Sequence, residues 1–242
     1  MQDQNVLVVS AHTADWLWRS GGTIAKYIEQ GANVHVVCLT YGARGESNEL
    51  WKAEGQTLAN VEQLRKAETE KAAGVIGIRN LEFWGYNDHM FEITSERLDR
   101  MMIKMRTVRP HIVLTHDKSD ILNPDHGIVS EYVLLAGRMA NSAGIVTEGL
   151  KTAPSMAIFG FEMSNADVND FKPSVYVDIT DVWEKKLAAM NCIEAQKKTV
   201  EVHVRLNTHR AWQARGVSRN KECKFAEAFS SRFPFVVNEF PG

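Results

Sequence analysis

Cysteine is scarce in this chain, and the thiols that are present lie far apart. The three cysteines among 242 residues are Cys38, Cys192 and Cys223, and they form no C-x-x-C pair. Disulfide frameworks and cysteine zinc sites are recognised by cysteines that recur in pairs at characteristic spacings. The sequence therefore predicts neither of these two kinds of site.

Long apolar runs and a strong excess of one charge are also missing. No apolar stretch approaches the length that spans a bilayer, and the chain opens M-Q-D-Q and passes straight into a strand, without signal-peptide features. The formal net charge of -2 gives no general attraction to nucleic acid or to an anionic membrane. We therefore expect a cytoplasmic protein with neither a nucleic-acid nor a membrane partner.

What is present is the composition of an ordinary globular protein, with 44% hydrophobic and 24% charged residues and no repeat or low-complexity linker. Apolar strand-like runs alternate with helical segments. The runs cover residues 5–11, 33–40, 80–84, 112–114, 157–161 and 175–179, and the helices 21–30, 61–76, 94–108, 125–143, 181–196 and 200–213. This order predicts an α/β fold in a single domain over residues 1–242, a Rossmann-like open and mostly parallel sheet with helices on both faces.

The first candidate site follows the first strand, in N-V-L-V-V-S-A-H-T-A-D. His12 and Asp15 come directly after its apolar run. Ligands bind in the crevice at the carboxyl ends of the strands of an open α/β sheet. Imidazole and carboxylate together suit zinc, although other divalent ions use them too. For two such residues alone, a local hydrogen bond or a helix cap is the alternative interpretation.

A second strand end carries more histidine, in I-V-L-T-H-D-K-S-D-I-L-N-P-D-H. His116 starts the polar loop, and His126 stands where that loop turns into the next helix. Two strand ends of this kind can supply two histidines and one aspartate with an open position. That arrangement is typical of a catalytic metal, whereas a structural site is closed by four protein ligands. His116 could orient a ligand from behind or bind a substrate carboxylate.

The motifs A-H-T-A-D, G-G-T-I-A, V-H-V-V-C-L-T-Y-G-A-R-G-E and N-P-D-H together resemble the LmbE/PIG-L family of zinc-dependent de-N-acetylases. The resemblance covers the first half of the chain well and implies an LmbE-like fold. In the family the first motif is A-H-P-D-D, and its histidine and final aspartate bind zinc with the histidine of P-D-H. The resemblance thus implies one Zn²⁺ per subunit held by His12, Asp15 and His126, with another divalent metal as the alternative.

One position departs from the deacetylase motif. The family's first aspartate, the general base, falls on Ala14, and a methyl group cannot take a proton. A branch with A-H-S-A-D, the hydratases of 4-oxalomesaconate in gallate breakdown, resembles this chain nearly end to end, including its D-I-T-D-V-W-E-K-K. In that branch Glu46 matches the glutamate expected to act as acid or base. In that branch a histidine is expected at the position of Ser164. This difference argues against an identical substrate.

Loops at strand ends supply the candidate substrate-binding residues. Arg44 lies in G-A-R-G-E and matches a family position near substrate, although a solvated turn is the alternative. Asn123 could hold a substrate oxygen. Asp88 follows the third strand and either lines the pocket or stabilises a loop. Arg215 lies in R-G-V-S-R-N-K, which is either a surface loop or a source of bidentate pairing to substrate carboxylates.

The helix at residues 61–76 is predicted to pack an apolar face inward and to expose its charges. The residues assigned to its solvated face are Glu62, Arg65, Lys66, Glu68, Glu70 and Lys71.

Two enzyme functions and one non-enzymatic function fit these residues. The first is a metal-dependent hydratase of a small anionic substrate, an unsaturated oxo-polycarboxylate such as 4-oxalomesaconate, with Glu46 and His116 as catalytic candidates. The second is a de-N-acetylase of an amino sugar or similar small amide, against which Ala14 argues. The third is a metal-binding regulatory or structural protein without catalysis, against which the intact ligand set argues. The resemblance also implies a homo-oligomer.

Overall fold

The structure is a computed structural model that describes residues 4–163 and 165–234. Within these ranges seven strands form one sheet in the order β3-β2-β1-β4-β5-β7-β6. The strands are β1 (Asn5–Ser10), β2 (Asn33–Thr40), β3 (Asn80–Tyr86), β4 (Ile112–His116), β5 (Ala157–Phe161), β6 (Val175–Asp178) and β7 (Ala226–Ser231). Strands β1 to β5 pair in parallel, and β7 runs antiparallel between β5 and β6. The predicted mostly parallel sheet is confirmed.

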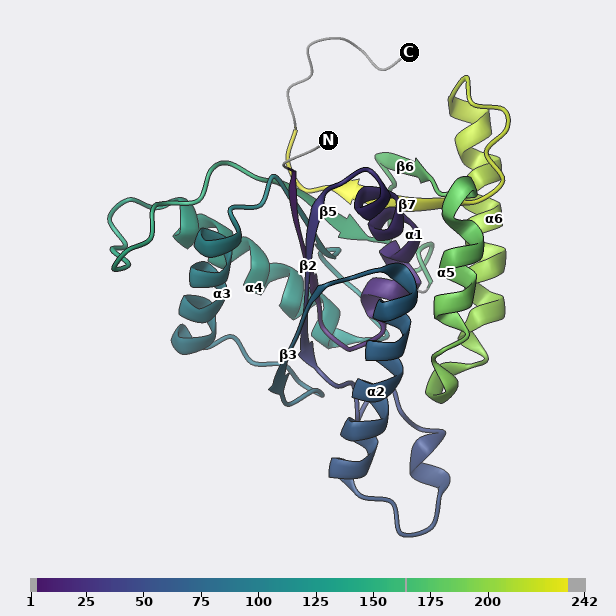
Figure 1. The fold of residues 1–242 in the computed structure, drawn as a ribbon, viewed down its shortest axis with the longest axis horizontal. Coiled ribbons are helices and arrows are strands. Elements are labelled where there is room, and N and C mark those ends of the chain that lie inside the picture. The colour runs from purple at the N-terminus through teal and green to yellow at the C-terminus, as the bar shows by residue number, and fades with distance from the viewer. Residues whose placement is uncertain (1–3, 164, 235–242) are drawn as a thin grey trace.

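Helices cover both faces of this sheet (Figure 1). They are α1 (Asp15–Glu29), α2 (Leu58–Ile76), α3 (Ser95–Val108), α4 (Pro124–Asn141), α5 (Trp183–Met190) and α6 (Thr199–Val217). Helices α3 and α4 lie on one face, and the other four lie on the opposite face. Side chains alternate between the two faces along a strand, so Val6 and Val8 of β1 join the core under α1, α2 and α5. Leu7 and Val9 join the core under α3 and α4.

The strand order reverses between β1 and β4. The chain goes from β1 outward to β2 and β3, and then returns to place β4 on the other side of β1, with Val6 opposite Ile112 and Val8 opposite Leu114. Such a switch point opens a crevice at the carboxyl ends of the two central strands. The residues that follow Ser10 and those around His116 therefore meet there.

Helix α1 begins at Asp15, six residues before the predicted start at Gly21. Residues 15–25 are all buried, so the N-terminal turns of α1 lie inside the protein. The glycines lie inside the helix, and a Cβ on Gly22 would come within 2.8 Å of the Ile179 side chain. Close packing, and not a turn, explains glycine at this position.

Other boundaries also differ from the prediction, and two of them bear on the site and on α5. The helix predicted over residues 181–196 is divided into a 3-10 turn at Thr180–Val182, α5, and a second 3-10 turn at Glu194–Gln196. His116 is the last residue of β4 and not the first residue of the loop after it.

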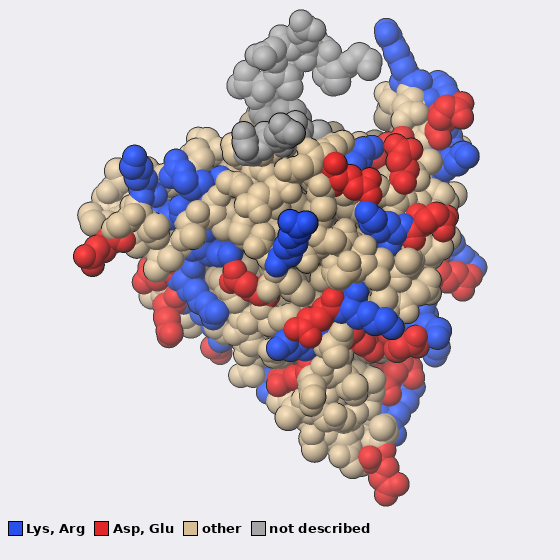
Figure 2. Space-filling view, viewed as in Figure 1, with Lys and Arg blue, Asp and Glu red and all other residues tan. Residues whose placement is uncertain are grey.

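No helix in the described part of the chain is long and apolar enough to cross a bilayer. Basic and acidic side chains are interspersed over the face shown in Figure 2, which accords with the net charge of -2.

Candidate metal centre

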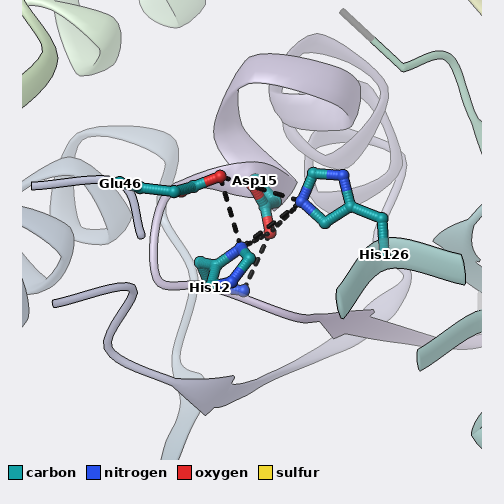
Figure 3. Close-up of side chains that lie close together, drawn as sticks. All are labelled: His12, Asp15, Glu46 and His126. Atoms are coloured by element: carbon teal, nitrogen blue, oxygen red, sulfur yellow. Dashed lines mark hydrogen bonds and ion pairs between the residues drawn. The ribbon is translucent and has the colours of Figure 1, made fainter. Parts of the chain in front are cut away.

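Four potential metal-ligating side chains meet at the carboxyl ends of β1 and β4 (Figure 3). They are His12, Asp15, Glu46 and His126, and one ligand atom of each lies within 4.8 Å of those of the others. They come from the turn after β1, the start of α1, the loop after β2 and the first turn of α4. The structure thus brings the three residues predicted as metal ligands together with the predicted acid or base.

Asp15 holds the turn after β1 in place. Its Oδ2 accepts the backbone N–H of His12 at 2.8 Å and lies 3.1 Å from Nδ1 of the same residue. Asp15 is also the first residue of α1, where the positive end of the helix dipole stabilises a carboxylate. A local hydrogen bond and metal binding, which are alternatives for an isolated His–Asp pair, are therefore compatible here.

Asp125 and Asp120 orient the two histidines from behind, and neither was singled out in the sequence. Nε2 of His12 donates to Asp125 Oδ2 at 3.2 Å, and Nδ1 of His126 donates to Asp120 Oδ2 at 3.0 Å. Outer carboxylates of this kind fix which ring nitrogen carries the proton. They leave His12 Nδ1 and His126 Nε2 facing the cluster, 3.3 Å apart.

The carboxylates of the cluster stabilise positive charge on the two histidines. Burial lowers the pKa of His12, but the carboxylates of Glu46, Asp15 and Asp125 outweigh burial and raise that pKa well above its ordinary value. Burial raises the pKa of Asp15, but the charges of His126 and His12 outweigh it and hold that pKa well below its ordinary value. Two imidazole nitrogens and two carboxylates that stabilise positive charge so strongly could hold a divalent metal ion.

Glu46 is aimed at the cluster by a tightly held loop. Its Oε1 lies 3.3 Å from His12 Nδ1 and accepts a hydrogen bond from Asn123 Nδ2 at 3.0 Å. Asp88 Oδ2 accepts the backbone N–H groups of Arg44 and Gly45 at 2.8 and 2.9 Å. Of the two roles considered for Asp88, these bonds correspond to loop stabilisation.

The other predicted substrate-binding residues differ in their placement. The Arg44 side chain is 38% exposed beside the loop, and its guanidinium donates to Asn87 Oδ1 at 3.0 Å. Arg215 lies in the last turns of α6, within a helix and not in the predicted polar loop, and it donates to the Cys223 carbonyl at 2.5 Å. The structure does not bring Arg215 to the cluster. Ser164 lies outside the described residues.

His116 packs behind the cluster as a neutral ring. Its Nε2 accepts the Ala11 backbone N–H at 3.0 Å and lies 3.3 Å from Asp15 Oδ2. The ring stacks on His126 with centroids 4.1 Å apart. Burial, together with the nearby charge of His126, lowers the pKa of His116 to about 3. A ring in this position supports Asp15 and His126 from behind.

The prediction for Arg65 of α2 is wrong. Arg65 was assigned to the solvated face of this helix, but it is only 1% exposed and its guanidinium faces Glu46, with Nη2 3.9 Å from Oε2. The local charge pattern gave no sign of this, because the groups that cover Arg65 belong to distant parts of the chain.

Known proteins are similar to this chain in sequence and in fold. The sequence model of the family PIG-L, GlcNAc-PI de-N-acetylase, matches residues 7–136. The 4-oxalmesaconate hydratase of Pseudomonas putida is 35% identical over 237 residues, which cover 97% of this chain and 91% of that protein. The chain belongs to the PIG-L/LmbE family.

Relatives within the PIG-L/LmbE family include enzymes of two reaction types. The crystal structure of GalB, the 4-carboxy-2-hydroxymuconate hydratase from Pseudomonas putida, matches with a TM-score of 0.94 and 34% identity, covering 98% of this chain and 100% of that one. The diacetylchitobiose deacetylase of Thermococcus kodakarensis is 30% identical over 200 residues, which cover 80% of this chain and 70% of that protein.

Proposed function

We propose that this chain is a metal-dependent hydratase that adds water to a small unsaturated oxo-polycarboxylate such as 4-oxalomesaconate. The observation that carries the proposal is Ala14. It stands, fully buried, where the deacetylase motif has its catalytic aspartate, while Glu46 lies beside the ligand cluster. The similarity to a hydratase over nearly the whole chain supports the same function.

The donor set fits Zn²⁺. His12 Nδ1, Asp15 and His126 Nε2 would hold the ion, because Asp125 and Asp120 direct these two ring nitrogens at the cluster. Two histidines and one aspartate leave a position open for water or substrate, as in catalytic zinc sites. When bound, the ion supplies positive charge that lowers the pKa of water and polarises substrate oxygens.

Glu46 is the residue that we assign to proton transfer. Hydration joins the oxygen of water to one carbon of the double bond and a proton to the other carbon. The Glu46 carboxylate takes the proton that water gives up, and a proton is returned to the carbon. Asn123 holds Oε1 of Glu46 in place during this exchange, through its hydrogen bond of 3.0 Å.

One cation in the loop, Arg44, suits an anionic substrate. We assign Arg44 to a substrate carboxylate because its guanidinium is partly exposed at the edge of the loop that carries Glu46. Arg215 is not part of this proposal, because its guanidinium is bonded at the far end of α6. A homo-oligomeric assembly and a cytoplasmic location stay predictions.

The alternative function is zinc-dependent removal of an acetyl group from an amino sugar or similar small amide. The family match and the 30% identity to a diacetylchitobiose deacetylase favour it. In that case Glu46 or His116 would have to replace the aspartate missing at position 14. His116 suits this role poorly, because its Nε2 already accepts a backbone N–H and its ring is buried.

The test is the fate of 4-oxalomesaconate with Zn²⁺-loaded protein, followed by loss of its ultraviolet absorbance while the bound zinc is measured separately. We expect fast loss in the wild type, none in His12→Ala or Glu46→Ala, and normal loss in Glu131→Ala, which alters an exposed glutamate of α4. An unchanged absorbance with stoichiometric zinc would contradict the proposal.

The variant Ala14→Asp separates the two functions. A deacetylase is expected to gain amide hydrolysis from the restored carboxylate, whereas a hydratase gains none and loses part of its own activity. A large gain in amide hydrolysis would therefore favour the alternative function.

A further inference from the structure

The buried guanidinium of Arg65 in α2 faces the carboxylate of Glu46. Its exposed fraction is 1%, and in the described part of the chain Glu46 is the one carboxylate within 4.0 Å of its guanidinium. The facing atoms, Arg65 Nη2 and Glu46 Oε2, are 3.9 Å apart. Both atoms are buried, and neither has a hydrogen-bond partner in the structure. A buried charge needs a counter-charge, so this pairing is the obvious compensation.

The remaining bonds of Arg65 hold the guanidinium without neutralising it. Nη1 donates to Gln196 Oε1 at 3.0 Å, and Nε donates to the Tyr41 carbonyl at 3.4 Å. Gln196 is itself fixed, because its Oε1 also accepts from Trp18 Nε1 at 3.1 Å. Tyr41 is the first residue of the loop that carries Glu46, so the same guanidinium contacts that loop at its beginning and near its middle.

The two oxygens of Glu46 therefore have different surroundings. Oε1 faces the metal centre, where it lies 3.3 Å from His12 Nδ1 and accepts from Asn123. Oε2 points away from the centre toward Arg65. A small rotation of either side chain closes the gap of 3.9 Å to a charge-assisted hydrogen bond, which is among the stronger hydrogen bonds in proteins.

We propose that Arg65 is a positioning residue that fixes the Glu46 carboxylate so that Oε1 is presented to the reacting water. This role rests on the proposed function of Glu46. Arg65 acts through Glu46 and not on the substrate, because a side chain that is 1% exposed behind the loop offers no surface to a ligand. Arg65 thus adds a positioning residue from α2 to the active site.

The role predicts a particular kinetic pattern. Without Arg65 the Glu46 carboxylate is free to rotate, and misplacement of a catalytic group by about 1 Å can cost up to about 100-fold in rate. We expect Arg65→Met to lower kcat by about 10-fold to 100-fold and to leave KM unchanged. In a Glu46→Gln background the same substitution has no carboxylate left to misplace, so it should cost little further.

The experiment is a double-mutant cycle on the zinc-loaded protein with 4-oxalomesaconate, comparing wild type, Arg65→Met, Glu46→Gln and the double variant. Arg106→Met is the matched control, because Arg106 is also a buried arginine (3% exposed), but it bonds backbone carbonyls such as that of Ala140. The control is expected to lower stability, seen as a lower Tm, and to leave kcat of the folded fraction unchanged. Arg65→Lys, which keeps the charge, is expected to recover part of the lost kcat.

The outcomes separate the two proposals. No hydration by the wild type contradicts the proposed function itself. Normal wild-type hydration with an unchanged kcat in Arg65→Met, or with a raised KM alone, overturns only the role of Arg65. An equal loss in both backgrounds overturns it too. Where Glu46→Gln is too slow to measure, the rescue decides, and Arg65→Lys that is as slow as Arg65→Met overturns the role.

Discussion

Asp125 accepts a hydrogen bond from Nε2 of His12 at 3.2 Å and thereby joins two segments that are 113 residues apart. Its oxygens also accept the backbone N–H groups of His89 at 2.9 Å and Phe91 at 2.7 Å. Burial raises the pKa of Asp125, but these bonds outweigh it and lower that pKa to about 2. One carboxylate thus connects the turn after β1, the loop after β3 and the first turn of α4.

This connection predicts the effect of Asp125→Asn on metal affinity. An amide has a single oxygen, so it cannot satisfy both backbone N–H groups and still accept from His12. His12 then loses its fixed tautomer, and we expect zinc affinity to fall by about 10-fold to 100-fold, the usual cost of removing such a partner. Competition with a chromophoric chelator at fixed pH measures the change.

Asp181→Asn is the control for this substitution, because Asp181 is an exposed aspartate in the 3-10 turn before α5. Its zinc affinity is expected to equal that of the wild type. Equal affinities in Asp125→Asn and Asp181→Asn would show that Asp125 does not orient the ligand.

Much of the fold could be predicted because β1 to β6 contain apolar runs, whereas β7 (A-E-A-F-S-S) lacks such a run and was not predicted. Strand β2 begins and ends where the sequence pattern places it, at Asn33 and Thr40, and β5 does so at Ala157 and Phe161. The start of α1 could not be predicted this way. The segment from Asp15 to Ser20 mixes polar and large apolar residues, and only packing by the sheet and α5 shows that all of them are buried.

The candidate ligands could also be found from sequence, because histidine and aspartate directly after an apolar strand are a local signal. The partners of those ligands gave no such signal. Asp120 is one of three aspartates between His116 and His126, and nothing local distinguishes it. Arg65 is buried by Gln196, which is 131 residues away in the chain, so its role depends on tertiary structure.

Alanine substitutions at two helical glycines are expected to have opposite effects on stability. A Cβ on Gly22 of α1 would lie 2.7 to 2.8 Å from side-chain atoms of Ile179, one of which is the Cβ of Ile179. A Cβ on Gly74 of α2 would meet nothing within 4 Å. We expect Gly22→Ala to lower the free energy of unfolding by about 1–3 kcal/mol, the range found for overpacking.

Gly74→Ala serves as the matched control and should raise the free energy of unfolding by about 0.5–1 kcal/mol, because alanine restricts the unfolded chain and favours the helix. Urea unfolding followed by circular dichroism measures both variants. Equal effects of the two substitutions would contradict the close approach of α1 to Ile179.

His203 predicts how stability depends on pH. It is 2% exposed, it stacks on Trp18 with ring centroids 5.3 Å apart, and its Nδ1 is buried without a hydrogen-bond partner. Burial, helped by the charges of Arg19 and Lys186, lowers the pKa of His203 well below its ordinary value. The ring is therefore neutral in the folded protein at pH values where the unfolded chain has already bound a proton.

The sign of the effect follows from this difference. Well above pH 6.5 the imidazole is neutral in both states and contributes no pH dependence. As the pH falls below 6.5, the unfolded state gains a proton that the folded state cannot take, so stability falls by about 1.4 kcal/mol per pH unit.

His203→Phe keeps a ring against Trp18 without a titrating group, so its free energy of unfolding is expected to lack this contribution. Urea unfolding of the chelator-treated protein at pH 7.5, 6.5 and 5.5 measures the difference, with exposed His209→Phe expected to follow the wild type. Parallel curves for the wild type and His203→Phe would show that His203 titrates alike in both states, against the burial seen in the structure.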